Sequence, residues 1–110
     1  MKPVRRLESA QADERDAVIH YAREAGLDLS LRFIDDLRNA YRSIGDRPGI
    51  GSPRYAEVLG IDNLRSRKLK NFPFLVFYVE RASHIDIWRV LHAQRDIAAS
   101  LRDAESDRIQ

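Results

Sequence analysis

The chain has 110 residues, 44% of them hydrophobic and 33% charged, and this length suits one compact domain. No stretch approaches the ~20 consecutive apolar residues that a membrane-spanning helix needs. The arginines near the N-terminus are not followed by the apolar segment of a secretory signal. With no cysteine, the chain has no disulfide or thiol chemistry, and the cytoplasm is the expected compartment. We therefore expect one cytoplasmic domain over residues 1–102, followed by a charged tail over 103–110.

The charges are unevenly distributed along the chain. Nineteen Lys and Arg against 17 Asp and Glu give a net charge of +2, which by itself does not indicate nucleic-acid binding. Arg65, Arg67, Lys68 and Lys70, however, fall within six residues, whereas acidic residues concentrate in the first half and at the tail. This distribution predicts one local basic surface on an otherwise mixed molecule.

The N-terminal part predicts a short strand and then a helix. Residues 2–7 contain a proline near their start and suit an edge strand. Apolar residues recur at three- and four-residue steps over 10–25, which predicts a half-buried helix. Ser9 is its expected N-cap, and Gly26 its expected end because glycine tolerates positive φ.

A second helix is predicted from a cap at Asp28 to Ile44, with Gly45 ending it. Two helices joined by so short a linker must run antiparallel as a helical hairpin, and their apolar faces need another layer to cover them. Side chains on one face of this helix are expected to pack in the core, and are also candidates for partner contact: Phe33, Leu37 and Tyr41.

The second half predicts a small antiparallel sheet. Prolines and glycines punctuate residues 46–63, which predicts a loop that lacks the strand and helix context of a phosphate-binding motif. Strands are predicted over 64–70, 72–79 and 84–92, the second of them central because both of its faces are apolar. Simple alternation on the last strand puts Ile85, Ile87 and Leu91 on one face and Trp88 and Val90 on the other.

A short helix is predicted over 95–101, which completes the expected fold class. That class is α+β, with an N-terminal helical hairpin packed on a small antiparallel sheet and a short C-terminal helix. Apart from the lone basic stretch, none of these patterns specifies a chemistry. The three histidines are dispersed and there is no cysteine, so no metal site and no cofactor are expected.

Four segments, in this order, resemble the ParE branch of the RelE/ParE toxin superfamily. They are Pro48 to Tyr55 (PGIGSPRY), Leu64-Arg65, Phe72 to Tyr78 (FPFLVFY) and Arg89 to Ile97 (RVLHAQRDI). Each segment alone is a weak signal, but together with the helical hairpin that precedes them they cover most of the chain in the right order. The last segment, with its R-V-L-H-x-x-R-D pattern, is the strongest single piece.

The resemblance implies a toxin of a two-gene toxin–antitoxin module. Its partner would be a ParD-like antitoxin of the ribbon-helix-helix type, whose C-terminal segment wraps across the helical hairpin and sheet edge in a hetero-oligomer. ParE-type members are known for poisoning DNA gyrase, and RelE-type members for cleaving messenger RNA on the ribosome. Because the two branches share a fold, the fold does not decide between these targets.

Ribonuclease chemistry would need an acid, a base and cations that stabilise the phosphorane-like charge. His92 is the best acid or base, and Arg65, Arg67 and Arg95 would supply the cations. RNA-cleaving relatives often carry a Tyr near this end, but this chain has none after Tyr78. The set looks incomplete, so the leading expectation is a toxin that binds gyrase and uses no catalytic residue. A non-toxic homologue that binds only the antitoxin is a third reading.

A structural reading of the closing motif stands beside the catalytic one. Arg89, His92, Arg95 and Asp96 can hydrogen-bond locally and fix the turn into the last helix, with Asp96 as its cap. Three readings remain open for the basic strand, namely a solvated face, a docking surface for an acidic antitoxin, and a contact to nucleic acid or gyrase. Its expected partner-binding residues are Arg65, Arg67, Lys68 and Lys70.

Overall fold

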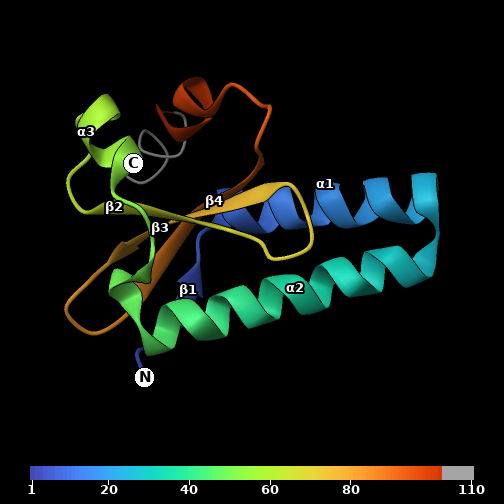
Figure 1. Cartoon of the computed structure of the whole chain (residues 1–110), viewed down its shortest axis with the longest axis horizontal. Helices are drawn as coiled ribbons and strands as arrows, with labels where there is room; N and C mark the ends of the chain where they lie inside the picture. The colour runs from blue at the N-terminus through green and yellow to red at the C-terminus, as the bar shows by residue number, and fades with distance from the viewer. Residues whose placement is uncertain (103–110) are drawn as a thin grey trace.

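The computed structural model describes residues 1–102 and has a helical hairpin packed against one face of a four-stranded sheet (Figure 1). In chain order the elements are β1 (Val4–Arg6), α1 (Glu8–Ala25), α2 (Leu27–Asp46), the 3-10 turn η1 (Pro48–Ile50), α3 (Arg54–Leu59), β2 (Leu64–Lys68), β3 (Phe74–Glu80) and β4 (Ile85–His92). Residues 97–102 are again helical. The predicted charged tail, 103–110, lies outside the described residues. The α+β class with its helical hairpin and short C-terminal helix is confirmed.

The sheet has the order β1-β4-β3-β2 and is mixed. β2, β3 and β4 are antiparallel neighbours, as predicted, but β1 runs parallel to β4. A parallel pair needs a long crossover connection, and here the helical hairpin and two strands lie between β1 and β4 in the chain. The prediction of a purely antiparallel sheet was therefore incomplete, whereas the predicted edge position of the first strand is confirmed.

The start of α1 differs from the prediction. The helix begins at Glu8, so Ser9 lies inside it and is not the N-cap. The Ser9 hydroxyl instead donates a hydrogen bond of 3.0 Å to the Trp88 carbonyl of β4. A tertiary contact has thus taken the side chain that local sequence rules assign to capping. The predicted end at Gly26 is confirmed by its φ of 95°.

α2 is longer at both ends than predicted. It begins directly after Gly26, so Asp28 lies in its first turn and is not its cap, and it ends beyond Gly45. Gly45 has a different role from ending the helix. A Cβ there would lie 2.9 Å from the Lys2 carbonyl oxygen, and Lys2 N donates to Gly45 O at 3.0 Å. Glycine is therefore required for the N-terminal strand to approach the helix.

The predicted loop after α2 contains a helix, α3, that the proline and glycine pattern concealed. The loop is also tied to the sheet. The Tyr78 hydroxyl accepts a hydrogen bond from Gly51 N (2.9 Å) and donates one to Pro48 O (2.7 Å). Ser52 and Ser66 exchange two backbone hydrogen bonds, Ser52 N to Ser66 O at 2.8 Å and Ser66 N to Ser52 O at 2.9 Å. The PGIGS segment is therefore an anchored structure.

A β-bulge changes which side chains of β4 face the hairpin. Tyr78 pairs with Ile87 and Phe77 with Arg89, so Trp88 is the extra residue of the bulge. An extra residue in one strand shifts the alternation by one position. The predicted faces are therefore wrong beyond the bulge: Val90 joins Ile85 and Ile87 on the hairpin side, and Leu91 joins Trp88 on the opposite side.

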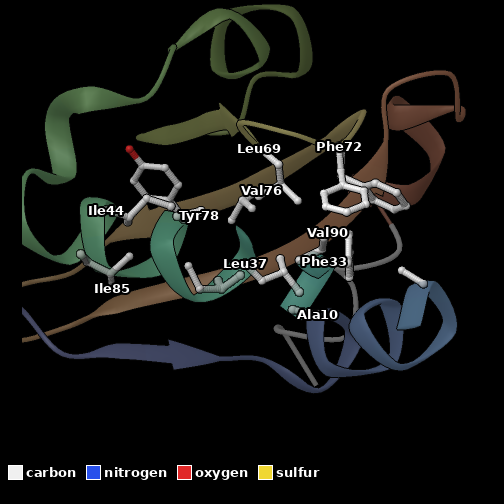
Figure 2. Close-up of a cluster of buried hydrophobic side chains, with 14 residues drawn as sticks. Ala10, Phe33, Leu37, Ile44, Leu69, Phe72, Val76, Tyr78, Ile85 and Val90 are labelled. Atoms are coloured by element: carbon white, nitrogen blue, oxygen red, sulfur yellow. The ribbon is translucent and has the colours of Figure 1, made fainter. Parts of the chain in front are cut away.

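Two apolar clusters lie on the two faces of the sheet. On the hairpin side, Phe33 and Leu37 of α2 meet Val76 and Tyr78 of β3 (Figure 2). On the other side, the helical residues 97–102 and α3 cover Trp88 and its neighbours. β3 is covered on both faces, as its sequence predicted. None of the helices in residues 1–102 combines the length and apolar composition needed to cross a bilayer.

Candidate functional site

A groove of about 550 Å³ runs between α1 and α2. The residues that line it include five apolar or aromatic side chains, Val18, Ile19, Ile34, Leu37 and Tyr41, and four charged ones, Arg6, Glu14, Arg15 and Arg38. Ile19 is 48% exposed, although it is a large apolar residue. An apolar floor with a charged rim is the usual form of a surface that receives a partner segment.

Part of the groove is lined by a polar network of Arg6, Glu14 and Tyr41. The Tyr41 hydroxyl donates a short hydrogen bond to Glu14, and Arg6 Nη1 lies 2.7 Å from the other oxygen of the same carboxylate. Burial, followed by the negative charge of Glu14, raises the pKa of Tyr41, so its hydroxyl stays protonated and remains a donor. Arg15 and Arg38 form no ion pair among residues 1–102, which leaves two cations of the rim without a carboxylate partner.

The three side chains of α2 predicted as partner contacts have different positions. Leu37 and Tyr41 line the groove. Phe33 is fully buried, and its ring lies 5.1–5.4 Å from the rings of Tyr21, Phe72 and Phe74. Phe33 thus packs in the core, as its helical spacing predicted, and offers no surface to a partner. The prediction of Phe33 as a partner contact is therefore corrected.

The predicted basic strand lies at the edge of the sheet as β2. Arg65 and Arg67 are half-buried and face the hairpin side, where they pair with Tyr78 and Val76 of β3. Arg65 Nη1 donates a 2.8 Å hydrogen bond to the Gly51 carbonyl, so this guanidinium holds the anchored loop. Lys68, at the end of the strand, is exposed.

His92 takes part in the turn that leaves β4. Its Nδ1 accepts a hydrogen bond of 3.1 Å from Gln94 N, and its carbonyl accepts one of 3.0 Å from Arg95 N. The imidazole also packs edge-on against the Phe74 ring at 5.2 Å. With one ring nitrogen engaged by the backbone and the Phe74 ring beside it, the imidazole is oriented by the turn.

Arg65, one of the cations proposed for a ribonuclease, lies far from His92 on the sheet. Arg65 pairs with Tyr78, and His92 pairs with Phe74, so the two residues are two strands apart and four residues apart along the sheet. These offsets correspond to about 13 Å along the strands and about 10 Å across them, or about 16 Å between the two Cα atoms. Arg65 also donates to a loop carbonyl. Within the alternative catalytic set, Arg65 and Arg67 therefore lie on β2, two strands from His92, whereas Arg95 follows His92 in the same turn.

Arg89 forms the most connected polar site among residues 1–102. Its Nε and Nη2 donate to the two carboxylate oxygens of Asp13 at 2.7 and 2.8 Å, and its Nη1 donates to Ser100 O at 2.8 Å. Asp13 also accepts from Val90 N at 3.0 Å. The ion pair therefore joins α1, β4 and the C-terminal helix. Asp96 Oδ1 accepts from Ala99 N at 3.2 Å, which places Asp96 at the N-cap of that helix.

Sequence reasoning missed Asp13, although a signal was present. Asp13 lies three residues after Ala10 and four before Ala17, so it stands within the apolar stripe of α1. A carboxylate in such a stripe needs a buried cation, because an unpaired buried charge is costly. The pattern therefore predicts a partner for Asp13, but it does not say which arginine.

Comparison with known proteins places these features in a family. A solved structure described as "Chromosomal ParDE TA system from P. aeruginosa" matches with a TM-score of 0.70 and 20% identity over 84% of this chain and 96% of that chain. At this identity the likeness shows the fold. Among curated proteins, none matches the sequence significantly. A family described as "ParE toxin of type II toxin-antitoxin system, parDE" matches residues 4–97. The resemblance noted in the sequence is thereby confirmed, and the chain belongs to the ParE toxins of type II toxin–antitoxin systems.

Proposed function

We propose that this ParE-family toxin inhibits growth by binding and poisoning DNA gyrase, and that a ParD-like antitoxin of the ribbon-helix-helix type neutralises it. The observation that carries a binding mechanism is the separation of His92 from Arg65, with each side chain engaged in a local structural contact. A ribonuclease needs its acid, base and cations within hydrogen-bond reach of one phosphate. Membership of the ParE toxin family supports gyrase as the proposed target.

The test is induced expression of the toxin without its antitoxin, with DNA synthesis and messenger-RNA integrity measured separately. We expect DNA synthesis to stop first while transcripts stay intact. In a purified reaction, gyrase with supercoiled DNA should accumulate cleaved DNA when the toxin is added. Rapid transcript cleavage with replication intact would establish the ribonuclease reading instead, and normal growth would identify a non-toxic homologue.

The His92→Ala variant tests the same proposal at one residue. The side chain accepts one backbone hydrogen bond and packs on Phe74 at the surface of the turn, so its loss is expected to cost about 1 kcal/mol of stability. We expect the variant to remain folded and to arrest growth as the parent does. A folded His92→Ala protein that no longer arrests growth would contradict a mechanism without catalytic residues.

For the antitoxin we propose the groove between α1 and α2 as the docking site. Its apolar floor suits the apolar side of an amphipathic segment, and its free cations, Arg15 and Arg38, suit carboxylates on the polar side of that segment. The bound partner would cover the exposed Ile19 side chain. This arrangement gives one surface both the apolar anchor and the charge complementarity that a specific protein partner uses.

Charge reversal at this rim is expected to weaken antitoxin binding. In the variant Arg15→Glu, Arg38→Glu, like charges would face the acidic side of the antitoxin, and we expect a loss of about tenfold or more in affinity. Isothermal titration with the antitoxin encoded beside the toxin gene measures the change. The matched control, Arg23→Glu, Arg32→Glu, alters the charge equally on exposed positions of the same two helices outside the groove. Equal losses in both variants would show that net charge alone, and not the groove, governs binding.

A further inference from the structure

The positive charge of the chain comes from one segment. Residues 47–70 contain six basic and two acidic residues, whereas the rest of the chain contains 13 basic and 15 acidic ones. The segment is thus strongly basic and the remaining protein slightly acidic. The net charge of +2 does not show this separation of basic and acidic residues along the chain.

The fold gathers these cations at one edge of the sheet. The loop that follows α2 runs back along β2, where Ser52 pairs with Ser66, between Arg65 and Arg67 (Figure 1). Arg54 begins α3 two residues after Ser52, and its backbone N–H is bonded to the Ser52 hydroxyl at 3.2 Å. The basic edge is therefore built from two chain segments and comprises Arg47, Arg54, Arg65, Arg67, Lys68 and Lys70.

The cations of the basic edge have no acidic partners among residues 1–102. Within residues 1–102 none of the six forms an ion pair, although elsewhere Lys2, Arg5, Arg6, Arg81 and Arg89 all do. Four of the six are exposed, and the other two are half-buried. Arg47 and Arg54 flank the loop that the hydrogen bonds of the Tyr78 hydroxyl fix, and the other cations lie on β2 or directly after it. The four exposed cations can therefore pair with an external anion, while Arg65 also holds the loop through its hydrogen bond to the Gly51 carbonyl.

The form of the basic edge suits a phosphate backbone. A binder of unpaired bases uses exposed aromatic rings as stacking platforms. The aromatic side chains nearest to this edge do not serve in that way, because Tyr55 packs edge-on against Phe77 at 5.3 Å and Tyr78 is buried. Arginine and lysine contacts to phosphates need neither stacking nor an apolar pocket. An acidic protein segment, in contrast, finds both an apolar floor and cations in the groove between α1 and α2.

We propose that the basic edge binds the phosphate backbone of duplex DNA, without reading its sequence. The toxin would then hold a DNA segment on the edge of its sheet and leave the helical groove to the antitoxin. The choice of DNA over RNA rests on the proposed function, since gyrase acts on duplex DNA. Binding to naked DNA requires no gyrase and is measured separately.

Fluorescence anisotropy with a labelled 24-base-pair DNA duplex tests the proposal at salt concentrations from about 50 to 300 mM, over which screening changes strongly. The variant Arg54→Glu, Lys68→Glu reverses two exposed charges of the edge, and the control Arg23→Glu, Arg32→Glu reverses two on the helices. We expect the edge variant to lose about tenfold or more in affinity at low salt. The slope of log affinity against log salt should fall by about 2, because each phosphate contact contributes about 0.9. The control should bind as the parent does.

Two further probes, an RNA duplex of the same sequence and a polyglutamate peptide, complete the experiment. DNA binding that is lost in the edge variant and kept in the control supports the proposal. Equal or tighter binding of polyglutamate would assign the edge to an acidic protein, and tighter binding of the RNA duplex would overturn the choice of DNA. No binding of the parent protein to the DNA duplex at low salt would refute the proposal, whatever the gyrase reaction shows.

Discussion

Replacing Arg89 with alanine is expected to lower the free energy of unfolding by about 3–5 kcal/mol. The side chains of Arg89 and Asp13 are only 11% and 6% exposed, and they share two hydrogen bonds. Removing the arginine leaves the Asp13 carboxylate buried without its cation and leaves the Ser100 carbonyl without that donor. Because domains of this size are stable by about 5–15 kcal/mol, the loss is a large part of the total. Urea unfolding followed by far-ultraviolet circular dichroism measures it.

Two further variants distinguish the effect of a buried unpaired charge from the effect of losing a cation at the surface. Arg5→Ala removes a mostly exposed cation 3.5 Å from Asp86 and should cost about 0–1 kcal/mol. In Arg89→Met, Asp13→Asn the Asp13 charge is removed together with that of Arg89, and the asparagine oxygen can still accept from Val90 N, so this double variant should be more stable than Arg89→Ala. A double variant that is less stable than the single one would show that the pair itself, and not the stranded carboxylate, accounts for the effect.

Replacing Phe33 with alanine is the second change with a large expected effect, about 3–5 kcal/mol of lost stability. The Phe33 ring is fully buried and meets the rings of Tyr21 in α1, Phe72 just before β3 and Phe74 at the start of β3. Its removal leaves a cavity where the hairpin packs on the sheet. Neighbouring aromatic rings are too large to move into that space without changing their own contacts. Thermal and urea unfolding both report the loss.

The controls for Phe33 also test its corrected role. Leu31→Ala, at a position of α2 that is 49% exposed, should change stability by only about 0.5 kcal/mol or less. Phe33→Leu keeps most of the buried volume and should bind the antitoxin as the parent does. If the Phe33→Leu protein were folded and yet had lost antitoxin affinity, Phe33 would have to contact the partner, and its assignment to the core would be wrong.

Periodic patterns in the chain were sufficient to predict most of the fold. Three patterns correspond to features of the structure. They are the apolar spacing on the second helix, the two-sided apolar run at Phe72 to Val79 and the helix end at Gly26. These features can be predicted from one segment at a time. A helix or strand must bury its apolar face against another layer, but its own pattern is the same whichever layer covers it. The family segments were likewise recognisable in the sequence, since they combine turn residues and core residues in a characteristic order.

The structural features that sequence reasoning missed depend on contacts between distant parts of the chain. Ser9 has the identity of a helix cap, yet it donates to a strand 79 residues away. Gly45 looks like a helix end, yet it is required by the close approach of Lys2. The bulge at Trp88 reverses the faces of Val90 and Leu91, and no local property of those residues reports it. In each case a tertiary contact outweighed a weak local preference.

The amino-acid sequence by itself determined the α+β class, the helical hairpin, the central strand, the family and the presence of a basic strand. Only the tertiary structure decided how the functional residues are grouped. It separated His92 from Arg65, placed Phe33 in the core, opened a groove between the two helices and brought Arg54 beside the basic strand. The physical reason is that periodicity assigns a residue to a face of its own element. Distances between residues of different elements depend on strand register and helix packing, which the whole chain determines together.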